Sequence, residues 1–539
     1  MHHLTELTSV EQIGFPILTA LICLPLLVAL ILNLIEDDHQ AYKIGLVGAG
    51  LEVLLTVVVA LSFQTHGPDL QFVEHGGGVP GLGLSYTLGV DGLNLMFLPL
   101  IALLTFFAVL LTEFCVQQGV KWYLIAMLAF QGMKMGAFVS LDLMLFWFFF
   151  TAELIPGWFL ITRWGTGQKR HEAAVQYTLM MLGAAASILF GVLLLRGEVG
   201  PDTPLNYATL LASSIPAEAQ GPIFLLLMLG LAIKLPIVPF HTWLPRVLAE
   251  GPIVAMTVFL VGVKLGAYGI LRFVLPFLPD AAHEYLDIVA ALGATSILYG
   301  GAAALVQVNL RRLLAFGSVA HMGVVVIGLF SLNFYGLQGG LLHMANLGLT
   351  GAGLFFVAAF IHTRLGPQAA SVLSGLSHST PVLAAVFLAL ALASIGLPGT
   401  SGFNADHLIV LGALSTRWWM AVFSAVCVFV TACYFLRYFR RAFLGPIRIA
   451  AVRDMPDLRR RELFVACVII GMVFTVGLFT EPFLQSTHAS LHTVAEKLER
   501  GEGHAGDKPH ARIGPGFLRA KPRPKPSERP NAQIAEVLR

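Results

Sequence analysis

Charge is scarce in this sequence. Asp, Glu, Lys and Arg make up 12% of its 539 residues, while 57% are hydrophobic. A soluble domain carries roughly 25% charged residues, so a chain of this length would lack the polar surface that keeps a protein dissolved. Soluble globular, disordered and collagen-like classes are therefore excluded, and a polytopic membrane protein remains. The net charge of +2 provides no basic field that would indicate a nucleic-acid partner.

Cysteine is scarce as well. The five cysteines form no C-x-x-C pair, and each lies in or at the end of an apolar run. The spacings typical of a disulfide framework, a zinc site or an iron–sulfur cluster are missing from the sequence. We therefore expect no cofactor and no metal in this chain, and we expect any associated redox chemistry to take place in other proteins.

Long apolar runs, in contrast, are abundant. A helix that spans a bilayer needs about 20 mostly apolar residues, and about fourteen such runs follow one another. They fall near residues 14–35, 43–63, 92–115, 119–140, 141–162, 172–196, 221–248, 252–275, 284–307, 311–332, 336–361, 379–412, 417–439 and 463–485. Two of them, 221–248 and 379–412, are long and interrupted by proline. The predicted fold class is all-α, a polytopic membrane protein with about fourteen transmembrane helices.

Positively charged loops predict the orientation. They lie at 163–170, before the tenth run at Arg311 and Arg312, and at 437–461 between the last two runs. All three fall on one side of the membrane if both termini face outward, and an excess of Lys and Arg marks the cytoplasmic side. The absence of Lys and Arg from the first 42 residues fits this placement. The basic C-terminal tail fits it less well, although long tails cross membranes largely regardless of charge.

Two segments depart from the helical pattern. Residues 64–91 contain a Gly-Gly-Gly sequence followed by alternating apolar residues, which predicts turns and a short hairpin. The tail from 490 to 539 is basic and rich in proline, with ten Lys and Arg against six Asp and Glu from residue 491 on. We expect this tail to be disordered or to wrap a neighbouring protein.

Charges inside the apolar runs require a reason, because one at mid-bilayer costs roughly 2.5–3.5 kcal/mol on insertion scales. The charged candidates are Glu52, Lys134, Glu153, Lys234, Lys264 and Asp406, and the polar companions include His241, His321, His343 and His407. A lone buried carboxylate such as Glu153 would take up a proton, whereas a lysine partner would keep it ionised. Lys234 and Lys264 are such partners in type and depth. A static ion pair that only fixes helix packing is the alternative.

The segment after Lys234 contains Pro236 and Pro239, which break the helix. A broken helix at membrane depth is tolerated where it lines a cavity or is buried in protein, and such breaks in two halves indicate a transport site. A second Leu-Pro break at 397–398 precedes Asp406. The separation of about 160 residues indicates an internal duplication over 119–275 and 284–439.

The other polar residues leave alternatives open. Small neighbours of Lys264 permit close helix approach, and His321 is either a proton relay near neutral pH or a hydrogen-bonded core residue. The same two interpretations apply to His241 and His343. Lys134 and Glu52 either pair with one another or extend to the membrane surface, and a functional role for them is a third possibility.

Taken together, these segments resemble the antiporter-like membrane subunits of respiratory complex I, most closely the subunit M family. The resemblance covers roughly residues 85–445 and rests on residues 88–93, 149–156, 233–245, 309–315, 318–323 and 396–403. It implies two inverted five-helix repeats, crossed at mid-membrane by a chain of charged and polar residues. It assigns proton transfer to Glu153, Lys234, Lys264, His321 and Asp406.

This chain departs from the family pattern in three places. The family has a histidine where this chain has Leu347, and His343 or Asn346 would have to replace it. Asp406 stands where subunit M has glutamate and its sister subunits have lysine, so an acid here favours subunit M. Lys134 is an intramembrane charge that the family pattern does not contain. These departures concern the second half more than the first.

The resemblance implies a proton-translocating membrane-arm subunit of a complex I-type NADH or ferredoxin:quinone oxidoreductase in a bacterial cytoplasmic membrane. Flavin, iron–sulfur clusters and quinone would reside in partner subunits. The alternatives are a subunit of an Mrp-type cation/proton antiporter or of a related hydrogenase or inorganic-carbon uptake complex, and a structural subunit that has lost transport. The predicted division is a three-helix region with a hairpin loop (1–118), two repeats (119–275 and 284–439), a basic loop with the last helix (440–489) and the tail.

Overall fold

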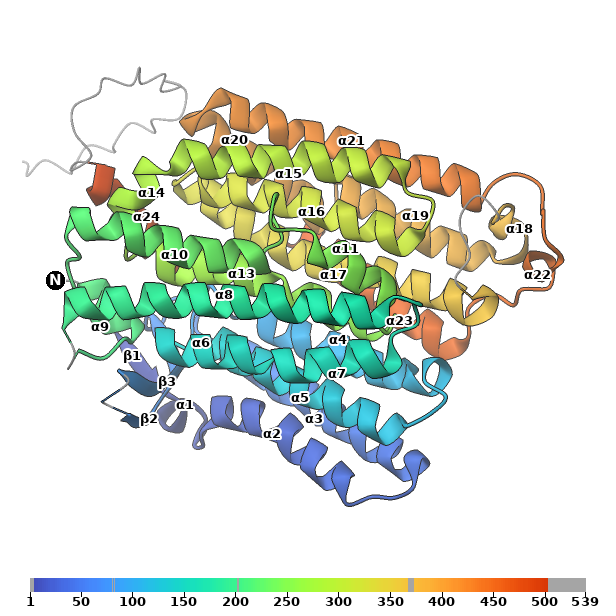
Figure 1. Ribbon diagram of the computed structural model, residues 1–539, viewed down its shortest axis with the longest axis horizontal. Coiled ribbons are helices and arrows are strands. Elements are labelled where there is room, and N and C mark those ends of the chain that lie inside the picture. The colour runs from blue at the N-terminus through green and yellow to red at the C-terminus, as the bar shows by residue number, and fades with distance from the viewer. Residues whose placement is uncertain (1–3, 80, 82, 201–202, 367–372, 503–539) are drawn as a thin grey trace, which may run out of the picture. The chain divides into compact units, whose positions relative to one another are not determined.

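The computed structural model describes residues 4–79, 81, 83–200, 203–366 and 373–502, and long helices that lie side by side dominate it (Figure 1). Twelve helices in this part of the chain are long and apolar enough to cross a membrane. They are Asp38–Ser62 (α3), Phe97–Cys115 (α4), Val120–Val139 (α5), Leu143–Trp164 (α6 and α7), Arg170–Val199 (α8), Ala217–Lys234 (α10), Ala255–Val274 (α12, α13 and a π-helical turn), Leu286–Val306 (α15), Leu310–Leu329 (α16), Phe334–Leu365 (α17), Trp418–Ala442 (α21) and Arg460–Leu478 (α23).

Two shorter apolar helices, Ile17–Asn33 (α2) and Pro381–Ile395 (α19), complete the set of fourteen predicted runs. The chain is therefore a multi-pass membrane protein, as its composition predicts. The remaining helices are Ser9–Ile13 (α1), Tyr207–Ala212 (α9), Trp243–Glu250 (α11), Pro279–Glu284 (α14), Leu376–Ser379 (α18), Ser401–Thr416 (α20), Ala450–Arg453 (α22) and Glu481–Glu502 (α24).

Several spans are interrupted within the membrane. Both predicted breaks are present, since α10 ends at Lys234 before α11 begins, and α19 ends at Ile395 before α20 begins. Figure 1 shows α10 ending about halfway along the neighbouring α8, with α11 continuing toward the other end. A third break was not predicted: the fifth span divides at Glu153 into Leu143–Ala152 (α6) and Leu154–Trp164 (α7). Pro156 explains this break, because proline has no N–H to donate to the carbonyl one turn earlier.

The eighth span is also irregular. It consists of Ala255–Gly262 (α12), Lys264–Gly269 (α13) and the π-helical turn Ile270–Val274 (η2). Every residue of this span is buried. Irregular backbone of this kind is frequent at functional sites, and here it falls beside Lys264.

The predicted hairpin is present and belongs to a three-stranded sheet. Leu70–Val79 (β2) pairs antiparallel with Leu84–Val90 (β3), and Glu6–Thr8 (β1) pairs parallel with β2. Figure 1 shows the sheet at the same end of the helices as α9 and α14.

The three arginine-bearing loops lie together at the opposite end. Arg311 donates to Thr166 Oγ1 at 2.6 Å and to the Gly251 carbonyl at 2.5 Å, and Arg364 pairs with Glu462. Figure 1 places α18 and α22 at that end, whereas the N-terminus and α24 lie at the other. The three loops therefore lie at one end of the helices, as the sequence predicts. Which end faces the cytoplasm stays a prediction.

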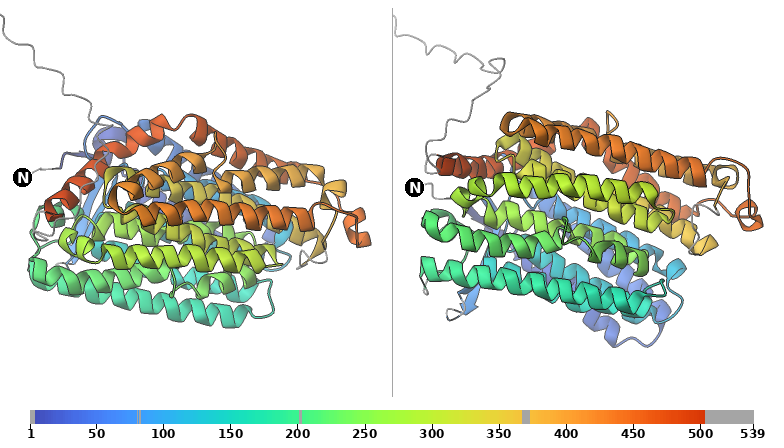
Figure 2. Two further views of the ribbon diagram at one scale, coloured as in Figure 1. Left: turned by 90° about the horizontal axis from the view of Figure 1, so that it is seen from above. Right: turned by 45° about the horizontal axis from the view of Figure 1, so that its top comes forward.

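The predicted boundary of the tail is wrong. Residues 490–502, expected to be disordered, form the last part of α24, and residues 503–539 lie outside the described part of the chain. The physical reason is an apolar stripe at helical spacing, since Leu491, Val494, Ala495 and Leu498 are all buried. Figure 2 shows α24 lying across the ends of the long helices. The last span also ends earlier than predicted, at Leu478.

Candidate functional site

The first site forms where two broken helices meet. Glu153 separates α6 from α7, and Lys234 is the last residue of α10. Their side chains form an ion pair, with 1% of the Glu153 side chain and 4% of the Lys234 side chain exposed. The ring of Phe150 lies 5.1 Å from Lys234 Nζ. Of the two lysines considered as partners of Glu153, the structure therefore selects Lys234.

Backbone geometry explains why Lys234 ends its helix. Pro236 and Pro239 lack the N–H groups that would continue the helical hydrogen bonds. The break is held by side chains from elsewhere: the Trp243 indole donates to the Ile233 carbonyl at 2.8 Å, and the Val238 N–H donates to Ser296 Oγ at 2.9 Å. Backbone groups freed by the prolines thus find partners inside the protein, as a break at membrane depth requires.

A polar cavity of about 450 Å³ adjoins this break. His241, within the broken segment, lines it and is 6% exposed, with its ring edge-on to Tyr299 at 4.8 Å. Lys169 and Arg312 from the arginine-bearing loops also line the cavity. The cavity therefore connects the loop end of the protein with the segment that follows Lys234.

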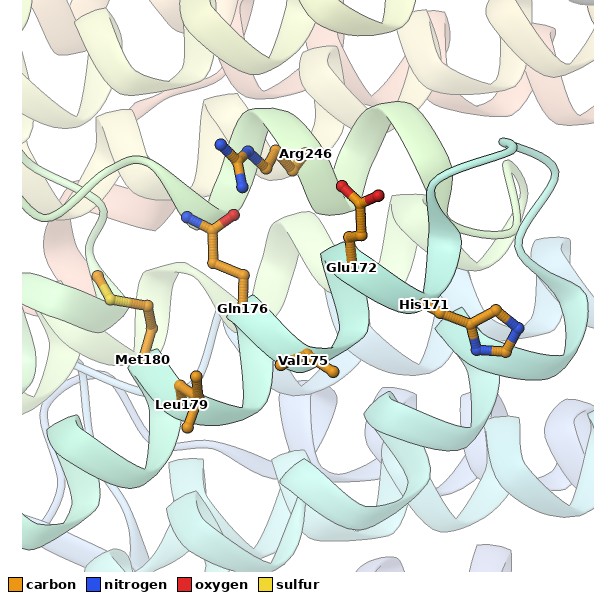
Figure 3. A pocket seen from close by; sticks show the side chains of 7 residues that line it. All are labelled: His171, Glu172, Val175, Gln176, Leu179, Met180 and Arg246. Carbon is orange, nitrogen blue, oxygen red and sulfur yellow. The ribbon is translucent and has the colours of Figure 1, made fainter.

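A second pocket, of about 690 Å³, lies on the face of α8 (Figure 3). Its lining residues are His171, Glu172, Val175, Gln176, Leu179, Met180 and Arg246. Figure 3 shows Glu172 and Gln176 extending toward Arg246 of α11. Glu172 and Arg246 line both pockets, so polar groups extend from the α8 surface to the cavity at His241.

Lys264 lies at the joint between α12 and α13 and is 2% exposed. Its Nζ donates to the Leu260 carbonyl at 2.6 Å, and within the described ranges no carboxylate lies within 4 Å of it. Its span packs against the end of α10 at Gly266 and against α17 at Leu260. Lys264 is therefore a buried cation on the span that lies between the first site and the helix that carries His343.

The second site contains two histidines and an acid. His343 Nδ1 lies 3.0 Å from Asp406 Oδ1, and the rings of His321 and His343 are 5.4 Å apart. His321 Nε2 is 3.3 Å from the Tyr434 hydroxyl. The helix break here relies on Gly396, whose φ of +88° suits glycine and whose missing side chain leaves room for Asp406 Oδ2.

The structure distinguishes the two residues considered as replacements for the missing family histidine. His343 contacts the acid, whereas Asn346 accepts a hydrogen bond from Ser401 Oγ at 2.8 Å and helps to hold the start of α20. Leu347 is buried at 7% exposure and contributes only apolar packing. His407 stacks on Phe403, one turn before it in α20.

Lys134 and Glu52 do not form the predicted pair, and neither reaches the membrane surface. Their side chains are 0% and 1% exposed, and no ion pair joins them. Instead, Lys134 Nζ lies over the Phe130 ring, 3.0 Å from its centroid, and has no hydrogen-bond partner among the described residues. Both carboxylate oxygens of Glu52 likewise have no hydrogen-bond partner among the described residues.

Sequence reasoning missed one buried ion pair. Arg272, in the π-helical turn, forms two hydrogen bonds of 2.7 and 2.5 Å with Asp91, and both residues are almost fully buried. The Tyr268 hydroxyl accepts a further hydrogen bond from Arg272 at 3.1 Å. The pair fixes the segment between β3 and α4 against the eighth span. An arginine inside an apolar run was the signal that could have identified it.

Comparison with known proteins identifies the family of this chain. Residues 140–431, more than half of the chain, match the family model described as NADH:quinone oxidoreductase/Mrp antiporter, TM. NADH-quinone oxidoreductase subunit M from Rickettsia typhi is 31% identical over 497 residues, which are 90% of this chain and 100% of the relative. NADH-ubiquinone oxidoreductase chain 4 from Arabidopsis thaliana is 31% identical over 491 residues, covering 90% of this chain and 98% of the relative. The chain therefore belongs to the NADH:quinone oxidoreductase/Mrp antiporter family of membrane subunits.

Solved structures agree with the fold. A chain of respiratory complex I from Thermus thermophilus superposes with a TM-score of 0.82 at 30% identity, covering 89% of this chain and 99% of that one. A chain of the Mrp complex from Dietzia sp. gives a TM-score of 0.79 at 22% identity, covering 91% of this chain and 99% of that one. The second likeness concerns the fold alone.

Proposed function

We propose that this chain is a proton-translocating membrane-arm subunit of a complex I-type NADH or ferredoxin:quinone oxidoreductase. The observation that carries the proposal is the Glu153–Lys234 ion pair at two helix breaks inside the membrane. A buried pair of this kind is held at a desolvation cost that apolar packing would avoid. Its placement at broken helices beside a polar cavity supports transport rather than packing.

Protons come from the arginine-loop end, which faces the cytoplasm by the positive-inside rule. They pass the cavity that contains His241 and reach Lys234. When Lys234 moves away from Glu153, each loses the partner that favours its charged form, so the two exchange protons with their surroundings. Lys264 and His321 carry the proton onward, and Asp406 with His343 release it on the side of both termini.

The chain works inside a larger assembly in a bacterial cytoplasmic membrane. Flavin, iron–sulfur clusters and quinone belong to its partner subunits, and this chain binds none of them. Quinone reduction in those subunits supplies the energy, so this chain is part of a translocase without a redox centre of its own. Other membrane-arm subunits and the lipid bilayer are its direct neighbours.

A second candidate is a subunit of an Mrp-type cation/proton antiporter, or of a related hydrogenase or inorganic-carbon uptake complex. It is favoured by the family model, which covers both kinds of assembly, and by the fold likeness to an Mrp chain. The chains that co-purify with the tagged protein decide between the candidates, because only the first requires partners that carry iron–sulfur clusters and bind quinone.

The test of the proposal is proton pumping in sealed membrane vesicles that contain the assembled complex. We expect Glu153→Gln and Lys234→Ala to abolish pumping, with Glu113→Gln as the control. Glu113 also pairs with a cation, Arg461, but its side chain is 43% exposed, so its loss should leave pumping unchanged. Full pumping by either buried-pair variant, at normal assembly, would disprove the proposal.

A further inference from the structure

Lys134 is the second lysine near Glu153. A Cβ atom added to Gly262 would lie 3.1 Å from Lys134 Nζ and 3.8 Å from Glu153 Oε2, so both groups border the same glycine. Glu153 is already paired with Lys234, and Lys134 Nζ has no hydrogen-bond partner among the described residues. One buried carboxylate therefore faces two buried amines.

Charge balance limits this cluster. Two ammonium groups and one carboxylate would leave a net positive charge that no other described acid within ion-pair distance offsets. An uncompensated charge in a dry interior is strongly disfavoured. The cluster is therefore more stable one proton short, and the missing proton can be taken from either lysine.

Two further buried polar groups, Gln131 and Glu52, lie on the helix of Lys134 and on helix α3, which packs against it. Helices α3 and α5 run in the same direction, because Asp38 at the start of α3 accepts hydrogen bonds from the N–H groups of Val120 and Lys121 at the start of α5. Gly45 of α3 faces Leu124 of α5.

Two turns beyond Gly45 on the same face of α3 stands Glu52, and two turns beyond Leu124 on the same face of α5 stands Gln131. Both side chains are fully or almost fully buried, and their polar atoms have no hydrogen-bond partner among the described residues. Gln131 is three residues from Lys134, which makes the two neighbours on the helix surface. The polar groups thus extend from Glu153 through α5 to α3.

We propose that Lys134 is a second proton carrier for Glu153, and that Gln131 and Glu52 extend this branch from the Glu153–Lys234 pair to helix α3. In the transfer step, a proton that arrives along the branch converts Lys134 to an ammonium while Lys234 is still charged, and the Lys134 ammonium gives this proton to the Glu153 carboxylate. The products are a neutral amine and a neutral acid, so the cluster keeps its total charge. Lys234 then has no anionic partner, which favours its release of a proton toward Lys264. The branch rests on the proposed function.

The first test compares Lys134→Met with Tyr123→Phe in the assembled complex in sealed vesicles. Tyr123 lies on the same helix and also has a buried hydroxyl without a described partner, so it controls for the loss of such a group. Groups that transfer protons typically contribute roughly 10²–10⁴-fold, and because Lys234 remains in place we expect Lys134→Met to slow pumping per electron about tenfold. Tyr123→Phe should pump like the wild type.

The second test separates proton transfer from charge alone. Lys134→Arg keeps a positive charge that is not given up, so we expect it to pump as poorly as Lys134→Met. Gly262→Ala leaves the lysine in place but puts a methyl group 2.5 Å from its Cε, which should separate Lys134 from Glu153 and slow pumping several-fold. If the Lys134 variants do not assemble, Gly262→Ala alone tests whether Lys134 transfers protons to Glu153.

Infrared difference spectra supply a measurement that a purely structural role would not change. The band of protonated Glu153, identified by its absence in Glu153→Gln, should lose intensity in Lys134→Met. Normal pumping and an unchanged band in Lys134→Met, while Glu153→Gln does not pump, would overturn the branch and leave the proposed function intact. Normal pumping in Glu153→Gln would overturn the proposed function itself.

Discussion

The two halves of the protein have similar broken helices but place different chemistry at them. In the first half, Glu153 and Lys234 carry opposite charges and are at most 4% exposed. In the second half, the partner of Asp406 is His343, and the acid is 15% exposed. An acid beside lysine ordinarily forms an ion pair at neutral pH, whereas a histidine pair is ionic only when the ring is protonated.

The difference also concerns position along the helix. Lys234 is the last residue of α10, where the partial negative charge of the helix end favours a cation. Asp406 lies in the second turn of α20 and extends back toward Gly396 at the end of α19. The first half thus holds an acid paired with an amine, which is broken only when a proton moves through it, and the second holds an acid–histidine pair that is ionic only while the ring carries a proton. Helix breaks at corresponding places in the two halves therefore need not have the same function.

The largest expected effect concerns the stability that the Glu153–Lys234 pair contributes. Lys234→Met leaves Glu153 buried without a cation and should lower the free energy of unfolding by about 3–5 kcal/mol. Asp406→Asn should cost only about 1 kcal/mol, because this side chain is 15% exposed and the amide that replaces the carboxylate stays beside His343. Detergent titration of the purified assembly, followed by circular dichroism, measures both.

The double variant Glu153→Gln with Lys234→Met is the control for this comparison. It removes both charges together and should regain most of the stability lost in the single variant. Equal losses for Lys234→Met and Asp406→Asn would contradict the distinction between the two halves.

A second prediction concerns transport through the second half. Asp406→Asn removes the carboxylate that receives a proton beside His343, and we expect pumping per electron to fall about tenfold, less than the complete loss expected for Glu153→Gln. Sealed vesicles with a pH-sensitive dye measure it. An unchanged pumping stoichiometry would instead favour a second half that has lost transport.

A third prediction, with a smaller expected effect than Lys234→Met, concerns the support of the first break. Ser296→Ala removes the hydroxyl that accepts the Val238 N–H, and an unpaired buried N–H costs about 1–3 kcal/mol. Thr295→Ala changes the neighbouring residue on the exposed face of α15 and should have almost no effect. Ser401→Ala gives the corresponding measurement at the second break, where Asn346 would lose its donor. A loss for Thr295→Ala equal to that for Ser296→Ala would contradict the role of Val238.

Features with a local signal were predictable. The fourteen apolar runs follow from hydropathy, and both Leu-Pro breaks follow from proline chemistry. Glu153 and Lys234 were recognised as candidates because a charge in an apolar run is costly. That the two are partners required the fold, since Lys264 fits Glu153 equally well in type and depth.

Other features depend on distant parts of the chain. Asp91 and Arg272 are 181 positions apart, so no local pattern joins them. Pairing of Lys134 with Glu52 was one of the alternatives left open, but Lys134 instead borders Gly262 together with Glu153. Helix α24 was missed because its few apolar residues stand in a strongly polar segment, where composition masks their spacing.

Helix α24 also limits how the halves can move. It is bonded to the N-terminal region through Gly92 and Ser490, to the first predicted repeat through Lys497 and the Leu211 carbonyl, and to the second through Gln338 and the Leu484 carbonyl. Carriers that work by rocking need their two halves to swing as separate bodies about a central site. A helix anchored on both halves resists such swinging. Ions crossing this protein must therefore advance by small rearrangements of interior side chains while the scaffold stays still.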